Sequence, residues 1–407
     1  MADTYLQEQI SQSPELSETY SELLSLYENK QWHQLTHKLS ALVSDRKGWK
    51  NENMVDLYRN FVAEFKARLN PVSVVEFGVT AANQLYPSRP YNADELAKAK
   101  AFLGEILSFL NEGTSKNTLL GASAALCDNA RFLCESEILL FDILGEADAF
   151  GQQTLLQQLN ERQKTLEDLR SPEPVVQGSY YKCAAELHRA MGSHGKFYKT
   201  GLMYLVFTPS DNIARGSGME WATDLSLAAL LGDGIYNFGE ILTNSVLTCL
   251  QGTDKEWLRK MLEVFNNGDI DGFLRLLKSE KSTIAAQRPD FMDKVPELTK
   301  KLELLALTDL IFRRPANERI ISFSDIAAKT KKNLDEVEML VMRAMSVGLI
   351  KGVVDGVDRV LEATWVEPRV LDAPQINSLC GRLGDWGDKV HETLIFIENQ
   401  TPELFQG

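Results

Sequence analysis

Two histidines stand four residues apart in a segment with helical spacing, at His33 and His37. On a helix this spacing places both imidazoles on one face, as in the zinc proteases. Those enzymes need a glutamate directly after the first histidine as general base, and Gln34 takes that position here. An amide cannot accept the proton, so we expect polar residues of a repeat helix and no metal centre at this pair.

A loose cluster of glycines at Gly232, Gly234 and Gly239 is the second candidate, because glycine-rich loops bind phosphate groups. The cluster follows a predicted helix, whereas a phosphate-binding loop follows a strand and continues into Lys-Ser or Lys-Thr. We therefore interpret these glycines as helix-turn residues and expect no nucleotide cofactor.

A thiol and two imidazoles, at Cys183, His188 and His194, have the chemistry of a nucleophile with its base. Nothing in their spacing brings them together, and a buried, unreactive cysteine is the usual case. No pair of acidic residues stands out as an acid–base couple, and the histidine pattern of a JAMM-type zinc isopeptidase is missing. The sequence predicts no catalytic residue, no metal ligand and no cofactor site.

The bulk properties favour a folded protein whose partners are other proteins. The chain has 407 residues, of which 44% are hydrophobic and 25% charged, and its formal net charge is −14. This charge disfavours nucleic acid or an anionic membrane as the main partner. Five cysteines without a C-x-x-C pair indicate reduced thiols. The first ten residues have no signal-peptide core, and no apolar run is long enough to span a membrane, so we expect a cytoplasmic and nuclear protein.

Amphipathic helical segments dominate the chain up to residue 207. Trp32 and Leu35 match the opening of a tetratricopeptide repeat, but Thr36 stands where that consensus has glycine, and no 34-residue period emerges. We therefore expect a right-handed stack of degenerate, TPR-like helical pairs over residues 1–207. A polar loop at 208–218 follows, and further helices are expected over 219–314.

The stretch 320–366 carries the order of a winged helix. A short apolar segment of Ile320, Ile321 and Phe323 predicts a buried strand end, and Ser322 and Asp325 form a capping box for a short helix. A second cap at Asn333 opens a longer amphipathic helix. Two β-prone runs then surround Asp355-Gly356, a tight-hairpin signal.

A winged helix is typical of DNA binding, but the charges of this one argue for protein interaction. Between residues 320 and 366 six basic residues face seven acidic ones, a net charge of −1. The expected recognition helix begins with Asp335, Glu336 and Glu338, which would repel the phosphate backbone. The DNA hypothesis rests on Lys329, Lys331 and Lys332 alone, which we interpret as a solvated turn.

A last helix is predicted over 375–397, with apolar residues at spacings of 3, 4, 3, 4, 4 and 3. This pattern is close to a heptad seam and indicates a helix that packs against partners. Glycines within the segment lower its intrinsic helicity by about 1 kcal/mol each relative to alanine. The alternative is a helix folded back on its own chain. The seam residues are Ile376, Leu379, Leu383, Trp386, Val390, Leu394 and Ile397.

Helical repeats followed by a winged helix are the plan of the PCI domain, here expected over 219–366. Three stretches resemble the PCI subunits of the proteasome lid more closely: LGDGIYNFGE at 231–240, FNNGD at 265–269 and TWVEPRVLD at 364–372. The resemblance covers the whole chain. It implies a non-catalytic scaffold that joins other lid subunits through winged-helix contacts and a C-terminal helical bundle, with no small-molecule substrate, nucleic acid or membrane.

The resemblance also points to a partner surface on the wing, where a neighbour could add a strand. The residues predicted for this edge are Ile350, Val353, Val354, Val360 and Glu362. The chain's own loops could instead cover the edge. Alternatives for the whole chain are a PCI scaffold of the COP9 signalosome or of translation initiation factor 3, and a nucleic-acid-binding PCI protein.

Overall fold

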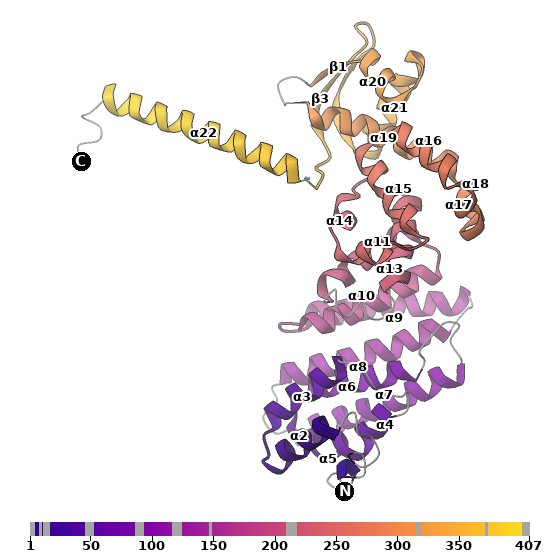
Figure 1. Ribbon diagram of the computed structural model, residues 1–407, viewed down its shortest axis with the longest axis vertical. Coiled ribbons are helices and arrows are strands. Elements are labelled where there is room, and N and C mark those ends of the chain that lie inside the picture. Colours follow the sequence, from indigo (N-terminus) through magenta and orange to yellow (C-terminus); the bar gives the residue numbers. More distant parts are fainter. Residues whose placement is uncertain are drawn as a thin grey trace. The chain divides into compact units, whose positions relative to one another are not determined.

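The fold is seen in a computed structural model that describes residues 5–7, 10, 17–44, 53–85, 93–115, 124–145, 149–208, 218–314, 319–370 and 373–400 (Figure 1). The chain divides into two compact units, Met1–Asp233 and Gly234–Gly407. Apart from its two ends, the loop predicted at 208–218 lies outside the described residues.

Helices make up the N-terminal unit. They are α2 (Ser17–Glu28), α3 (Trp32–Ser44), α4 (Asn53–Leu57), the π-helix η2 (Tyr58–Val62), α5 (Ala63–Phe65), the 3-10 helix η3 (Lys66–Arg68), α6 (Pro71–Gln84), α7 (Ala93–Ser115), α8 (Ala124–Gly145), α9 (Ala149–Asp168), α10 (Pro174–Ala190), α11 (His194–Phe207) and α13 (Gly218–Leu231). Neighbours in sequence pack as pairs, such as α2 with α3, α7 with α8 and α10 with α11. The predicted helical pairs are confirmed.

Local sequence explains how these helices start. Pro71 occupies the first turn of α6, and the Asn70 side chain accepts a hydrogen bond from the backbone N–H of Val72 at 3.1 Å. The residues at the tetratricopeptide-like opening are structural: Leu35 is fully buried, and the Trp32 ring stacks on Phe65 with centroids 5.6 Å apart. The repeat-like residues Trp32 and Leu35 therefore serve to pack neighbouring helices against each other.

The boundary between the two units falls after α13, whereas the sequence predicted a boundary at the loop 208–218. The reason is that α13 packs on α11 of the helical repeats. Gly234, the first residue of the second unit, has a φ of +72°, a conformation that glycine adopts without strain.

The helical part of the C-terminal unit comprises α14 (Gly239–Leu242), the 3-10 helix η4 (Ser245–Leu250), α15 (Glu256–Asn267), α16 (Ile270–Ser279), α17 (Lys281–Gln287), α18 (Pro289–Asp293) and α19 (Val295–Arg313). The FNNGD stretch turns the chain between α15 and α16. Gly268 ends α15 with a φ of +60°, and the Asp269 side chain caps α16 by accepting from the Gly272 N–H at 3.0 Å.

The winged helix follows the predicted order. Its elements are β1 (Ile320–Ser322), α20 (Phe323–Thr330), α21 (Leu334–Val347), β2 (Ile350–Asp355) and β3 (Val360–Val366). The sheet is antiparallel in the order β1-β3-β2, with an irregularity between Lys351 and Gly352. Ser322 Oγ accepts from the Asp325 N–H at 3.2 Å, as the capping box predicted. Helices α20 and α21 pack on α19 and share a core with the sheet.

Several local predictions within the winged helix are wrong. Ile320 is 60% exposed because its side chain lies on the open face of the sheet, and not in the core. The Asn333 side chain makes no cap bond, and Asp325 pairs with Arg314. The hairpin turn spans four residues, because Asp355 Oδ1 accepts from the N–H groups of Val357 and Asp358, and Arg359 has a φ of +52°.

The last helix, α22 (Ala373–Gln400), extends the predicted 375–397 at both ends (Figure 1). From Ile376 to Gln400 every residue whose burial is described is exposed. Among the described helices of the chain, none combines the length and the hydropathy that a membrane span requires. The fold is thus helical repeats, a winged helix with a small sheet and a C-terminal helix, as predicted.

Candidate protein-interaction site

The lysines that carried the DNA hypothesis are paired within the C-terminal unit. Lys329 Nζ lies 3.5 Å from the Asp309 carboxylate, and Lys331 pairs with Asp271. Lys332 Nζ lies 3.3 Å from Glu303 and 3.5 Å from Glu336. The turn keeps contact with solvent, since Lys331 is exposed, but its ammonium groups also pair with carboxylates of the chain itself, which the sequence did not predict.

The pKa values of this cluster follow from the same pairs. Burial would lower the pKa of Lys332, but the carboxylates of Glu303 and Glu336 raise it overall. The hydrogen bond from Lys331 lowers the pKa of Asp271. A phosphate backbone would have to compete with these carboxylates for the lysine ammonium groups, which weakens the DNA hypothesis further.

The outer face of α21 carries acidic side chains in its first turn and exposed methionines after them, where a DNA reader needs basic or amide side chains. Met339 is 66% exposed and Met342 is 47% exposed, one helical turn apart. The opposite face of α21 is buried in the winged-helix core through Val337, Leu340 and Val341. Exposed methionines are adaptable apolar contacts, so this face is suited to protein surfaces.

The wing offers one strand edge, and it belongs to β2. Strand β3 lies in the centre of the sheet and pairs with β1 on one side and β2 on the other. The prediction that Val360 and Glu362 belong to an open edge is therefore wrong, because both lie on β3 and β1 occupies the second side of that strand. Among the described strands, none pairs with the outer side of β2.

The five residues predicted for this edge have different surroundings. Ile350 is 1% exposed and belongs to the core, and Val354 is half-buried against that core. Val353 is 64% exposed, and it lies directly opposite Glu362, which is also exposed. Val360 is half-buried on the central strand. Of the five, Val353 combines a place on the β2 edge strand with an exposed side chain.

Two exposed residues of the same sheet were missed by the sequence prediction. Ile320 of β1 lies opposite Glu362, so Ile320 and Val353 flank this carboxylate on the open face. Trp365 is 38% exposed, and the Lys351 ammonium lies 5.1 Å from the centre of its ring. Strand β1 is too short to show a period in the sequence, so the outward side chain of Ile320, beside the fully buried Ile321, is seen only in the structure.

The seam of α22 is open along its length. Its seven apolar side chains are each 41–66% exposed, from Leu379 at the low end to Trp386 at the high end. Near the C-terminal end the exposed apolar surface widens beyond the seam, because Ile395 and Phe396 are 44% and 63% exposed. A helix that is apolar on several sides needs cover from several directions. These two residues were not part of the predicted seam.

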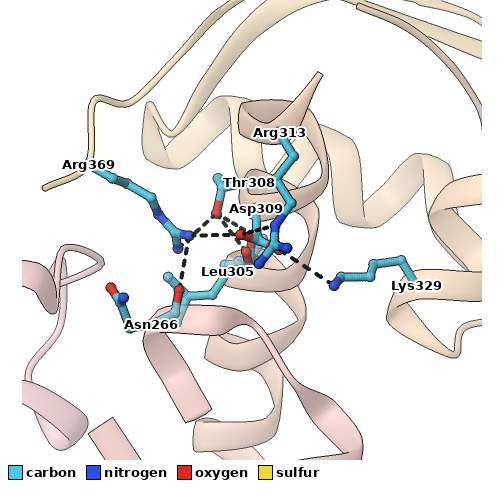
Figure 2. Close-up of polar contacts among 8 residues, drawn as sticks. Asn266, Leu305, Thr308, Asp309, Arg313, Lys329 and Arg369 are labelled. Carbon is cyan, nitrogen blue, oxygen red and sulfur yellow. Dashed lines mark hydrogen bonds and ion pairs between the residues drawn. The ribbon is translucent and has the colours of Figure 1, made fainter. Parts of the chain in front are cut away.

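The segment between the wing and α22 is fixed by Arg369 (Figure 2). Its guanidinium donates to the Asn266 carbonyl at 3.2 Å and lies 3.7 Å from the buried carboxylate of Asp309. Arg313 Nε also donates to Asp309, at 3.0 Å, and Lys329 approaches it from α20. Burial lowers the pKa of Arg369, and Asp309 opposes this effect. One carboxylate thus ties α19, α20 and the post-wing segment together.

The three stretches that resemble proteasome-lid subunits meet around this segment. Arg369 comes from the third stretch and binds the carbonyl of Asn266 in the second. Val370 packs on Gly239 in the first, where an added Cβ would lie 2.4 Å from the Val370 Cβ. The stretches are therefore parts of one junction that positions the start of α22.

Comparisons with known proteins agree with this assignment. A family model described as PSD13 N-terminal repeats matches residues 19–262, and a PCI-domain model matches residues 284–365. The chain is 34% identical over 400 residues to the 26S proteasome non-ATPase regulatory subunit 13 homolog B of Arabidopsis thaliana, covering 98% of both chains. The chain belongs to the family of 26S proteasome non-ATPase regulatory subunit 13.

The chain also has relatives in the subunit 13 family from other organisms. The subunit from Dictyostelium discoideum is 30% identical over 391 residues, which cover 96% of this chain and 95% of the relative. The 26S proteasome regulatory subunit RPN9 of Saccharomyces cerevisiae is 33% identical over 383 residues, covering 93% and 92%. The likeness therefore includes both units and α22, and the resemblance to PCI subunits of the lid is confirmed.

The residues first considered for chemistry have structural surroundings in this subunit 13 family member. His33 and His37 are exposed on α3, with ring centres 4.8 Å apart. Cys183 is buried, donates to the Ser136 carbonyl at 2.9 Å and has a pKa raised by burial. Burial lowers the pKa of His188. Among the described residues, no group of three or more metal-ligating side chains comes together.

Proposed function

We propose that the chain is a non-catalytic scaffold subunit of the lid in the 26S proteasome regulatory particle. The single observation that carries the proposal is the open apolar seam of α22 on a chain of the subunit 13 family. A scaffold subunit needs surfaces that are incomplete without neighbours, and this helix is such a surface. Support of lid assembly, and through it of ubiquitin-dependent protein degradation, is the function that follows.

Each part of the chain has its own role in this scaffold. The helical repeats, residues 1–207, form the arm, and the PCI domain, residues 219–366, carries the docking edge. The helix at 375–397 is the assembly anchor. Each apolar side chain that becomes fully buried in a bundle contributes roughly 1.5–3 kcal/mol relative to exposure. The seven seam residues together can therefore offset the cost of ordering a helix that contains several glycines.

The two proposed contacts use different physics. Among the described strands none pairs with the outer edge of β2, so a strand or loop of a neighbouring subunit can add to its backbone donors and acceptors. Val353 supplies an exposed apolar side chain at this edge. The α22 seam instead packs by side-chain complementarity with other helices in a bundle. Disrupting either contact should weaken incorporation, with the larger loss at α22.

Deletion of residues 375–407 tests the proposal directly. We expect the truncated chain to keep its folded repeats and to fail to co-purify with the regulatory particle, as seen by native gel electrophoresis and mass spectrometry. Leu383→Asp places a charge on the seam and should reproduce the loss. Gly381→Asp is the matched control, because an aspartate there points away from the seam. Normal incorporation of the deletion variant would refute the role of α22.

Mass spectrometry of the co-purifying subunits also separates this proposal from a PCI scaffold of another assembly. Recovery of signalosome or initiation-factor subunits in place of proteasome subunits would favour that alternative. Cytoplasmic and nuclear localisation is part of the proposal, and imaging of a fluorescently tagged chain tests it.

A further inference from the structure

The N-terminal unit contains a cleft between α6 and α10, two helices that both pack on α8. Its volume is about 380 Å³, large enough for an extended side chain and part of its backbone. One wall is a polar stripe of α6 that includes Ser73, Glu76, Thr80 and Asn83. These residues recur at the three- and four-residue spacing of one helix face. The sequence prediction assigned no role to this surface.

The charged groups of the cleft are distributed unevenly. The Glu137 carboxylate is buried on α8, and the Lys182 ammonium lies 3.4 Å from it, so that pair is satisfied. Glu76 is different. Burial raises its pKa, and the charged group that raises it further is another carboxylate, Glu173 at the start of α10. Among the described residues, no cation forms an ion pair with Glu76.

Apolar and aromatic side chains surround the cleft. Phe77 lines it beside Glu76, and Val175 lines it from the first turn of α10 with 40% of its surface exposed. Phe207 closes one side, and its ring is held by stacking on Tyr181, with centroids 5.5 Å apart and an interplanar angle of 5°. These surfaces fit an aliphatic stem, and the aromatic rings favour a cation nearby.

We propose that this cleft binds an arginine or lysine side chain from a basic, partly apolar peptide segment of a partner protein. The cationic head would pair with Glu76, and its aliphatic stem would contact Val175 and Phe77. Charge complementarity decides the chemistry, because Glu76, Glu137 and Glu173 exceed Lys182 in charge and repel an anionic ligand. The site lies on the helical repeats, within the N-terminal unit, and the proposal does not depend on the assembly surfaces proposed above.

The probe is the C-terminally amidated peptide Ala-Leu-Arg-Leu-Ala with an uncharged fluorophore on its N-terminus, whose anisotropy is measured with the full chain at low ionic strength. We expect saturable binding, and an about tenfold or greater loss when citrulline replaces arginine, because citrulline keeps the shape and removes the charge. Glu76→Gln should cause a similar loss. Glu161→Gln, on the exposed surface of α9, is the matched control and should change affinity less than about twofold.

A stability measurement distinguishes a binding carboxylate from a structural one. Because burial raises the folded-state pKa of Glu76, the folded protein binds its proton more tightly than the unfolded chain. Stability is therefore lost as the pH rises from the ordinary pKa of glutamate through the raised value. Glu76→Gln removes this loss, so its Tm at neutral pH should equal or exceed that of the unchanged chain, and its advantage should vanish in acid.

Loss of peptide binding together with an unchanged or higher Tm supports the proposal. Three binding results would overturn it: no saturable binding of the arginine peptide, equal binding of the citrulline peptide, or full affinity in Glu76→Gln. A Tm that falls on this substitution would also overturn it, because Glu76 would then have a partner within the chain. Incorporation into the proteasome is not measured here, so failure of this test leaves the scaffold proposal unaffected.

Discussion

Helices α21 and α22 carry the same kind of pattern, apolar residues at helical spacing, and they differ in what covers it. The apolar face of α21 is closed by its own domain: Val337 and Val341 are fully buried, and Leu340 is 7% exposed. The seam of α22 is at least 41% exposed at every position. Both helices are amphipathic, but α22 alone of the two lacks a covering surface among the described residues.

The difference between the two helices shows what an amphipathic pattern predicts and what it leaves open. A periodic apolar face means that a helix needs cover, but the pattern does not say which chain provides it. For α21 the cover is supplied nearby, by α19, α20 and the sheet. For α22 no such elements follow in the described part of the chain. Three glycines also weaken the helix, which makes cover by partner helices the more important.

The two helices should differ most in how much stability the protein loses when one aspartate replaces an apolar residue of either helix. Val337→Asp in α21 would bury an unpaired carboxylate, and we expect the winged helix to lose about 4 kcal/mol or more of stability. Leu383→Asp in α22 should change the stability of the isolated chain by less than about 0.5 kcal/mol. Urea unfolding, with hydrogen exchange of the α21 amides, measures both effects.

The contrast would reverse if α22 folded back on its own chain in solution. Leu383→Asp would then destabilise the isolated chain by an amount comparable to a core substitution. Hydrogen exchange along α22 gives a second measure, because an uncovered helix exchanges faster than α21. Equal protection of the two helices would contradict the structural comparison.

A smaller effect should come from the junction that precedes α22. Asp309→Ala removes the buried carboxylate that holds Arg369, and we expect a loss of about 3 kcal/mol in the stability of the C-terminal unit. Arg369 is the residue most affected, since its side chain is 11% exposed, whereas Arg313 is 60% exposed and can reach water. Urea unfolding again measures the loss.

The control for this substitution is Asp325→Ala. Asp325 pairs with Arg314 at 2.8 Å, but its side chain is 50% exposed, so we expect a loss of less than about 1 kcal/mol. Equal losses of stability in the two variants would mean that burial of Asp309 does not strengthen the contribution of its ion pair with Arg369. A loss confined to Asp309→Ala would support the junction as the element that fixes where α22 begins.

The sequence predicts local features of this chain well because they depend on neighbouring residues. The order of the winged-helix elements, the Ser322 cap and the heptad of α22 all follow from spacing and turn chemistry. The three short stretches at the junction are recognisable for the same reason. Each is a run of residues with a local conformation, such as the left-handed Gly268 that ends α15.

Long-range pairing was not predictable in the same way. Strand β1 has three residues, too few to show a period, so its place beside β3 did not follow from the pattern. Lys331 pairs with Asp271, sixty residues away, and sequence alone does not match distant charges. The position of Glu76, which has no ion-pair partner in the described part of the chain, likewise depends on how α6 and α10 pack. Edges, ion pairs and clefts therefore required the structure.

The smallest effect concerns the glycines of α22. Gly384 has open space around it, with no atom of the described chain within 4 Å of an added Cβ. Gly384→Ala should therefore stabilise the α22 helix in the isolated chain by up to about 1 kcal/mol, and circular dichroism of the variant can detect the gain in helicity.

Incorporation of the same variant into the assembled particle shows whether partner helices contact only the seam or also the side of α22 that carries Gly384. If partner helices approach Gly384 closely, the alanine should weaken incorporation despite the stabler helix. Unchanged or improved incorporation would show that the partners contact the seam alone, and that the glycine weakens α22 without a packing role.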